Sequence, residues 1–136
     1  MQRLQTRAQF QAVLAGTTVA RTTHFALHRT GLDAQAPPPA DARPLVAVPK
    51  ALFPVQEPWV GALIPKRWAK RAVTRNAIKR QIYAVSQHLE ARLSKAAHVV
   101  RLRSAFDRAK FPSASSDALK QAVRGELQQL FARAAQ

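Results

Sequence analysis

The stretch WVGALIPKRWAKRAVTRNAIKRQIYAVSQHL, residues 59–89, holds a strand pattern and a helix pattern in succession. It opens with a compact apolar run of strand length that ends at Pro65. From about Ala72 onward the apolar residues recur at steps of four, three and four, at Ile78, Ile82, Val85 and Leu89. Such a stripe is typical of an amphipathic helix with one buried face. The segment therefore predicts a strand and a helix joined by a basic connection.

Shorter patterns on both sides of this segment add further elements. Thr6 can cap a short helix whose apolar positions recur at three- and four-residue steps, and Gly16 can end it. Residues 22–30 alternate with a period of two, which is typical of a strand, and residues 97–106 begin in the same way. A last helix, capped near Ser115 or Ser116, directs five apolar residues toward the core: Leu119, Val123, Leu127, Leu130 and Phe131.

Seven of the nine prolines lie in residues 31–58. Proline removes amide donors and favours extended or turn conformations, so we expect a long loop there, with room for a short strand at 45–48. The order is then helix, strand, loop, strand, helix, strand, helix. This order predicts a single α+β domain over residues 1–136, a small α/β sandwich in which helices pack on one mixed central sheet.

The charge balance indicates a polyanionic partner. The chain of 136 residues has 22 Lys and Arg against 7 Asp and Glu, a net charge of +15, and its 47% hydrophobic content is that of a globular protein. It has no cysteine, which excludes disulfides and thiolate metal sites. We find no secretory signal and no apolar run near the roughly 18 residues of a membrane span, so we expect a soluble, cytoplasmic protein.

The positive charge is concentrated in residues 66–80, which hold seven cations, while no carboxylate occurs between Glu57 and Glu90. A solvated helix face usually interleaves Glu with Lys, so these cations are expected to bind an external anion. On a helical wheel Asn76, Lys79, Arg80 and Tyr83 fall together on the side away from the apolar stripe, with Arg75 at its border. Asn76 can hydrogen-bond a base edge, a 2′-hydroxyl or a backbone group.

The sequence offers no catalytic or metal centre of its own. The seven carboxylates are scattered, with no pair spaced to share one helix face. His24 and His28 would share one strand face about 13 Å apart, too far to hold one ion together. No glycine-rich phosphate loop is present. The chain therefore resembles a binding protein, although an enzyme that cleaves RNA unaided through His24, His28 or His98 stays open as an alternative.

The basic segment and the elements around it resemble a known protein family. KRWAKRAVTRNAIKR, residues 66–80, resembles the arginine-asparagine signature of the bacterial ribonuclease P protein subunit. RLQTRAQFQAVLAG resembles the family's opening helix, THFALH its first strand, and AHVVRLR with the final helix its closing elements. Seven residues match the signature in register: Ala72, Val73, Arg75, Asn76, Ile78, Lys79 and Arg80.

The resemblance implies a division of labour between protein and RNA. In this family a catalytic RNA, with magnesium bound mainly by that RNA and the substrate, hydrolyses precursor tRNA and releases its 5′ leader. The protein binds the catalytic RNA and the leader, and it is part of an endoribonuclease without contributing catalytic residues or a metal site. The resemblance also implies a left-handed βαβ crossover, against the usual right-handed rule. We expect no membrane partner and no obligate protein partner.

Two sets of site residues follow from the resemblance by position. The RNA-binding signature face comprises Lys66, Arg67, Lys70, Arg71, Arg75, Asn76, Lys79 and Arg80. The leader-binding cleft comprises Phe10, Leu14, Phe25, Leu27 and His28, whose apolar and aromatic groups can pack against unpaired bases. For the four apolar cleft residues, an ordinary place in the core is the competing interpretation. The chain departs from the family at Ala77, Tyr83, Ala84 and Gln87, where charged residues are usual.

Two binding alternatives also fit parts of the sequence. A ribosomal-protein-like RNA-binding module would explain the net charge and the basic helix without any role in RNA processing. A membrane-surface protein held by basic amphipathic segments would explain the charge as well, but large aromatic residues are absent from the apolar stripe of the basic helix.

Overall fold

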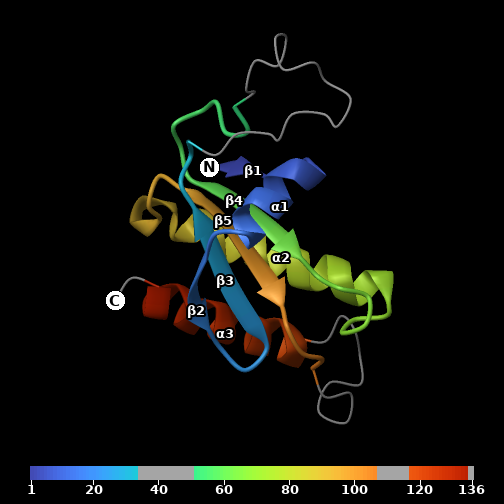
Figure 1. Ribbon diagram of the computed structural model, residues 1–136. Helices are drawn as coiled ribbons and strands as arrows, with labels where there is room; N and C mark the ends of the chain where they lie inside the picture. Colours follow the sequence, from blue (N-terminus) through green and yellow to red (C-terminus); the bar gives the residue numbers. More distant parts are fainter. Residues whose placement is uncertain (34–50, 107–116, 135–136) are drawn as a thin grey trace, which may run out of the picture.

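The computed structural model describes residues 1–33, 51–106 and 117–134 (Figure 1). The strand predicted at 45–48, most of the proline-rich segment and the caps predicted at Ser115 and Ser116 lie outside these residues. Among the described residues, no helix combines the length and the apolar character that crossing a membrane requires.

Five strands form one mixed sheet. The strands are β1 (Gln2–Arg3), β2 (Thr17–Arg21), β3 (Phe25–Thr30), β4 (Trp59–Leu63) and β5 (Ala97–Leu102). Their order across the sheet is β1-β4-β5-β3-β2, with β1, β4 and β5 mutually parallel and with β3 antiparallel to both β5 and β2. The predicted α+β class with a mixed central sheet is confirmed; the left-handed crossover stays an expectation from the resemblance.

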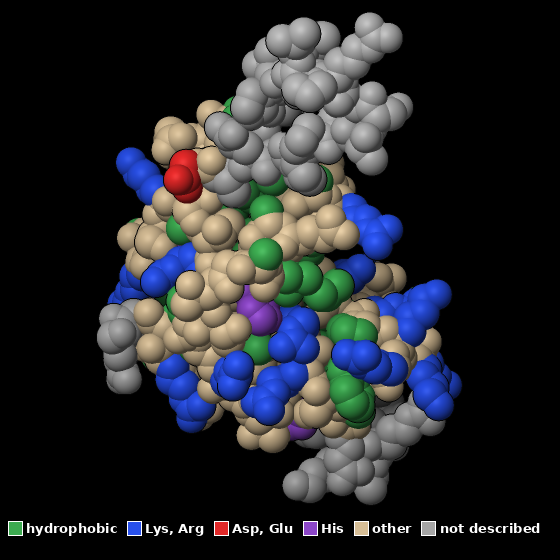
Figure 2. Space-filling view, viewed as in Figure 1, with side chains coloured by type: hydrophobic (Ala, Val, Ile, Leu, Met, Phe, Trp, Pro, Cys, Tyr) green, Lys and Arg blue, Asp and Glu red, His purple; other side chains and the backbone are tan. Residues whose placement is uncertain are grey.

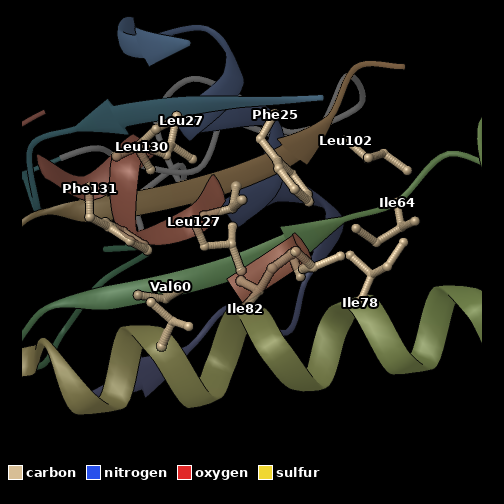
Figure 3. Packing of buried hydrophobic residues seen from close by; sticks show 14 of the residues in the cluster. Phe25, Leu27, Val60, Ile64, Ile78, Ile82, Leu102, Leu127, Leu130 and Phe131 are labelled. Atoms are coloured by element: carbon tan, nitrogen blue, oxygen red, sulfur yellow. The ribbon is translucent and has the colours of Figure 1, made fainter. Parts of the chain in front are cut away.

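Three helices cover the two faces of this sheet (Figure 1). They are α1 (Arg7–Leu14), α2 (Ala72–His88) and α3 (Asp117–Ala134), and a short 3-10 turn, η1 (Glu90–Arg92), follows α2. Helices α2 and α3 pack on one face, where Ile78 and Ile82 meet strand residues such as Val60 (Figure 3). Helix α1 packs on the opposite face over a smaller cluster that contains Val13, Trp59 and Val99. Strand β5 lies at the centre and contributes to both layers.

The cap predicted for α1 is present as a reciprocal capping box. The Gln9 backbone N–H donates to Thr6 Oγ1 over 3.2 Å, and the Thr6 backbone N–H donates to Gln9 Oε1 over 3.1 Å. The Gln9 side-chain amide also donates to the Leu52 carbonyl over 2.9 Å. One side chain thus caps α1 and fixes the chain that leads into β4.

Gly61 allows α1 to approach the sheet closely. A Cβ at this position would lie 2.7 Å from Leu4 Cδ1 and 2.7 Å from Phe10 Cε1, well inside van der Waals contact. The aromatic ring of Phe10 therefore occupies the space that a side chain on β4 would fill. Any larger residue at Gly61 would force the side chains of Leu4 and Phe10 to shift.

The structure adds strands that the sequence patterns did not predict and corrects one strand boundary. Strands β1 and β2 were missed, because β1 is too short for any periodicity and β2 is a half-buried edge strand. The predicted strand at 22–30 begins only at Phe25. His24 lies in the turn before it and accordingly does not share a strand face with His28.

The apolar stripe of α2 supplies a test of this packing. Ile82 is completely buried, so Ile82→Ala should lower the free energy of unfolding by roughly 2 to 5 kcal/mol, because it removes buried methyl groups and leaves a cavity. Val73 lies on the same helix with 52% of its surface exposed, and Val73→Ala should change stability by less than about 0.5 kcal/mol. Urea unfolding measures both; equal losses would contradict the burial of the stripe.

Candidate nucleic-acid interface

The cations of the signature face are open to solvent. Lys66, Arg67, Lys70, Arg71, Lys79 and Arg80 are exposed, as is Asn76. Figure 2 shows Lys and Arg gathering at the right of the view, over the start of α2. In the described part of the chain, the ion pairs are made by the Met1 ammonium and by His24, so no Lys or Arg side chain there has a carboxylate within 4.0 Å. This charge is available to an external anion.

A shallow groove collects the residues that the helical wheel placed together. It has a volume of about 420 Å³, lies between β1 and the outer face of α2, and is lined by Arg3, Asn76, Lys79, Arg80, Tyr83, Ala84 and Gln87. The prediction that Asn76, Lys79, Arg80 and Tyr83 share one face is confirmed. The groove brings three cations and the neutral amide of Asn76 to the same small volume, which suits a sugar-phosphate backbone.

Tyr83 forms the inner wall of this groove. Its hydroxyl oxygen accepts a hydrogen bond from the Ala62 N–H over 3.3 Å, beyond the end of the short β1 strand. The Arg3 guanidinium lies 4.2 Å from the centre of its ring, a cation–π contact. Tyr83 therefore satisfies a backbone donor of β4 and holds Arg3 beside α2.

Arg75 has a different role from its exposed neighbours. Its Nη1 donates to the carbonyl oxygens of Ala69 over 3.0 Å and Lys70 over 2.8 Å. The same connection is closed by hydrogen bonds from the Trp68 and Ala69 backbone N–H groups to the Pro65 carbonyl. The half-buried Arg75 side chain is thus bound to the basic connection before α2, and it positions the cations there.

The first turn of α2 adds positive potential to this region. Arg71 is its N-cap, its side chain makes no capping hydrogen bond, and the first turn contains no acidic residue. The initial N–H groups of the helix consequently lack a side-chain cap, and the helix dipole places partial positive charge there. This adds to the attraction that the exposed side chains exert on an anion.

The five residues of the predicted leader cleft do not all share one face, which is a correction. Phe10 and Leu14 are half-buried on the α1 face, and His28 points to the same face, because it pairs with Val99 of that cluster. Phe25 and Leu27 point to the opposite face, where they are 0% and 1% exposed in the core under α2 and α3. Strand alternation separates Phe25 and Leu27 from His28, and the competing interpretation as core residues holds for these two.

His28 is held in one tautomer by its neighbours. Arg101 Nε donates to His28 Nε2 over 3.1 Å, so this ring nitrogen must accept and the proton must sit on Nδ1. Nδ1 then donates to Thr18 Oγ1 over 3.1 Å. Burial lowers the pKa of His28, and the nearby charges of Arg101 and Arg21 lower it further. The neutral imidazole therefore lies beside an arginine that sequence reasoning did not assign to this face.

The three histidines considered for unaided cleavage do not converge. His24 Nδ1 lies 2.7 Å from Glu126 Oε1 of α3, and its ring stacks on Phe106. His98 points to the face opposite His28 and donates from Nδ1 to the Trp59 carbonyl over 3.1 Å. Across residues 1–33, 51–106 and 117–134, no three His, Asp or Glu side chains come together as a metal site. These contacts fit structural roles.

Sequence reasoning also missed Arg3 and Phe53. Arg3 reaches the groove only because β1 pairs with β4, and two residues give no strand signal. Phe53 is 1% exposed and packs edge-on against Trp59, with ring centres 5.4 Å apart, although its surrounding sequence reads as loop. No periodicity around Phe53 indicates that it is buried. The one available indication is a large aromatic residue within a proline-rich segment, since such residues are usually buried.

Comparisons with known proteins all point to one family. The family model for Ribonuclease P matches residues 1–134. The ribonuclease P protein component of Bordetella parapertussis is 35% identical over 133 residues, which cover 98% of this chain and 91% of that protein. The corresponding protein of Burkholderia mallei is 37% identical over 76 residues, 56% of either chain.

Solved structures share the fold. The RNase P protein of Staphylococcus aureus superimposes with a TM-score of 0.63 at 16% identity, covering 97% of this chain and 94% of that one. The RNase P protein of Thermotoga maritima gives a TM-score of 0.62 at 17% identity, covering 98% and 97%. At these identities the superpositions establish a common architecture of sheet and helices.

The role of Arg75 predicts a local effect of its removal. Arg75→Ala should speed amide hydrogen exchange of Trp68 and Ala69 by roughly tenfold, because the two carbonyls before α2 lose a charged donor. Lys79→Ala, which removes an exposed cation from the same helix, should leave those amides unchanged. Equal exchange rates in the two variants would contradict the positioning role and would make Arg75 one more exposed cation of the signature face.

The buried histidines predict a stability that depends on pH. Burial is the main cause that lowers the pKa of both His28 and His98 below the usual 6.5, so near pH 6 the unfolded chain binds more protons than the folded one. The free energy of unfolding should therefore fall from about pH 7.5 to about pH 5.5, by at most about 1.4 kcal/mol per pH unit for each histidine.

Urea unfolding across this range measures the slope. His98→Asn keeps a donor near the Trp59 carbonyl and should flatten the slope. An unchanged slope in His98→Asn would contradict the depressed pKa.

Proposed function

Because the chain belongs to the ribonuclease P protein family, we propose that it is the protein subunit of a ribonucleoprotein that removes the 5′ leader from precursor tRNA. The catalytic RNA performs the hydrolysis, and this chain binds that RNA together with the leader of the substrate. It acts in the cytoplasm and needs no further protein partner.

The observation that carries this proposal is the set of unpaired cations around Asn76. Lys79 and Arg80 line the groove beside Asn76, and Lys66, Lys70 and Arg71 lie in the connection that leads into the same helix. Keeping these like charges together without acidic partners costs stability in the free protein. Binding of phosphates, with release of their counterions, recovers that cost in the complex.

The neutral groups of the groove support RNA as the polyanion. Asn76 can donate to and accept from a 2′-hydroxyl, which is the group by which a protein distinguishes RNA from DNA at a contact. The planar Arg3 guanidinium, held over Tyr83, can engage a phosphate through two N–H groups or stack on an unpaired base. These interactions would set the position of the RNA, and the exposed cations would supply affinity.

The 5′ leader is assigned to the α1 face. Phe10 and Leu14 offer half-buried apolar surface there, and Arg101 lies beside the neutral His28 in the same layer of β3 and β5. Apolar surface beside a cation suits a single strand, whose bases pack while its phosphates pair. Phe25 and Leu27 have no part in this binding, since they face the other layer.

Magnesium is proposed to act mainly through the RNA and the substrate. The groove lining contains three cations and no carboxylate, whereas Mg²⁺ prefers carboxylate and other oxygen ligands. The protein would raise the effective affinity for the ion indirectly, by holding the two RNAs so that their phosphates share it.

Reconstitution tests the proposal. Cleavage of a precursor tRNA at low magnesium should be strongly stimulated when this protein is added to a ribonuclease P RNA from a bacterium with a similar protein, and the protein alone should not cleave. Absence of stimulation would contradict the proposal and would favour a general RNA-binding module, like a ribosomal protein, without a role in processing. Cleavage by the protein alone would place the chemistry in this chain.

Charge-matched variants locate the RNA on the surface. Arg80→Ala should weaken binding of the catalytic RNA and should reduce the salt dependence, the slope of log K against log salt, by about one unit for each phosphate that the variant no longer binds. Arg124→Ala removes the same charge from an exposed position on α3 and should leave both quantities unchanged. Equal effects would show that net charge alone matters and that the groove has no special role.

A further inference from the structure

A second, larger pocket lies on the opposite side of the sheet from α1. It has a volume of about 670 Å³ and forms where the ends of α2, η1 and α3 meet strands β3 and β5. Its lining includes Leu27, Arg29, Arg92, His98 and Phe131. The volume is within the range of about 300 to 1,000 Å³ that is usual for small-molecule sites. None of its lining residues belongs to the signature face or to the α1 face.

The walls of this pocket divide into an apolar floor and a cationic rim. Leu27 and Phe131 are buried in the floor, and Leu89 and Leu93 close it as half-buried residues. Arg29 is half-buried at the rim, with the exposed Arg92 as its counterpart on η1. An apolar floor with charge on one side suits a ligand that is flat and apolar at one end and anionic at the other.

The two rim arginines have no counter-ion in the described part of the chain. Among residues 1–33, 51–106 and 117–134 no carboxylate lines the pocket, and the side chains of Arg29 and Arg92 take no part in the ion pairs. Glu90, the acid nearest to Arg92 in sequence, binds the Met1 ammonium instead. A half-buried guanidinium without a counter-ion favours an external anion, and arginine suits the oxygens of phosphate.

A polar edge also faces the pocket, at His98 and Ser94. His98 Nδ1 donates to the Trp59 carbonyl, so Nε2 is the acceptor of the hydrogen bond from the Ser94 hydroxyl, whose oxygen lies 3.4 Å away. Both residues line the pocket. The Ser94 side chain is exposed, and its hydroxyl oxygen can still accept a hydrogen bond from the edge of a nucleobase.

We propose that this pocket binds one unpaired nucleotide, with the base against Leu89, Leu93 and Phe131 and the phosphate between Arg29 and Arg92. The site is separate from the groove at Asn76, and the proposal does not depend on the role in tRNA processing. The nucleotide belongs to a single-stranded RNA segment or is a free mononucleotide; the recognising chemistry is the same for both.

Direct titration of the whole protein tests this site. Adenosine 5′-monophosphate should bind with saturation and should shift the NMR signals of the His98 ring. Adenosine and inorganic phosphate should each bind at least about tenfold more weakly, because each lacks one half of the ligand. Phosphate binding as tightly as the nucleotide, or shifts confined to residues of the Asn76 groove, would overturn the proposal.

Three variants separate the pocket from general charge. Arg92→Gln should weaken nucleotide binding by roughly tenfold. Ala132→Phe, at an exposed lining position on α3, should abolish binding by filling the pocket without changing the charge. Arg124→Gln, which is not in the lining, should bind as the parent does. Unchanged binding in Ala132→Phe would overturn the proposal, and circular dichroism verifies that each variant is folded.

A short RNA distinguishes the two sources of the nucleotide. If an adenosine pentanucleotide binds more tightly than the monophosphate, and Ala132→Phe removes that advantage, the site accepts a strand of RNA. If the monophosphate binds at His98 and the pentanucleotide does not displace it, the site accepts free nucleotides; both results support the proposal. Neither titration involves the catalytic RNA or cleavage. Failure of nucleotide binding would therefore not contradict the proposed role in tRNA processing, and failure of the reconstitution would not contradict the nucleotide site.

Discussion

Parallel strands cannot be joined by a tight turn, and the pairing of β4 with β5 therefore requires a crossover that returns the chain to the end of the sheet at which β4 began. Helix α2 is that crossover, and its apolar stripe must lie on the sheet to fill the layer above Val60 and Val100. Once Ile78 and Ile82 are buried, the positions between them are forced outward. The same packing that completes the core thus presents the cations of α2 to solvent.

The cost of this arrangement falls on the electrostatics of the free protein. The formal charge is +15, and the ion pairs of the described residues join acids to the Met1 ammonium and to His24, so those acids do not offset the lysines and arginines. Glu126 illustrates the use of an acid for structure: it accepts from Thr22, from the His24 backbone and from its ring, and so ties the β2–β3 turn to α3. Glu57, Glu90 and Glu126 thus stabilise the fold, and the Lys and Arg side chains of the signature face are available to bind an anion.

The sequence predicts best where one face of an element is continuously apolar. The strand that ends before Pro65, helix α2 and the core positions of α3 all follow from such patterns and are confirmed. The wheel also predicts correctly that Asn76 and Tyr83 lie together, because the helical period fixes their directions.

What the sequence could not predict depends on pairing between distant segments. Arg3 reaches Tyr83 only through the pairing of β1 with β4, and Arg75 turns back onto two carbonyls, which no short window of sequence records. The resemblance placed Phe25 and His28 in one cleft, whereas the period of two along β3 sends them to different layers.

The bond between Gln9 and the Leu52 carbonyl has a consequence for how this protein can change over generations. It pins the chain just before β4, and Phe53 adds a buried aromatic anchor beside it, so the sheet receives β4 in register irrespective of what precedes Leu52. The free energy needed to close a loop grows only by about 0.6 kcal/mol for each doubling of its length. The chain between Thr30 and this anchor is therefore a permissive place for evolution to lengthen or shorten the polypeptide while the binding surfaces keep their positions.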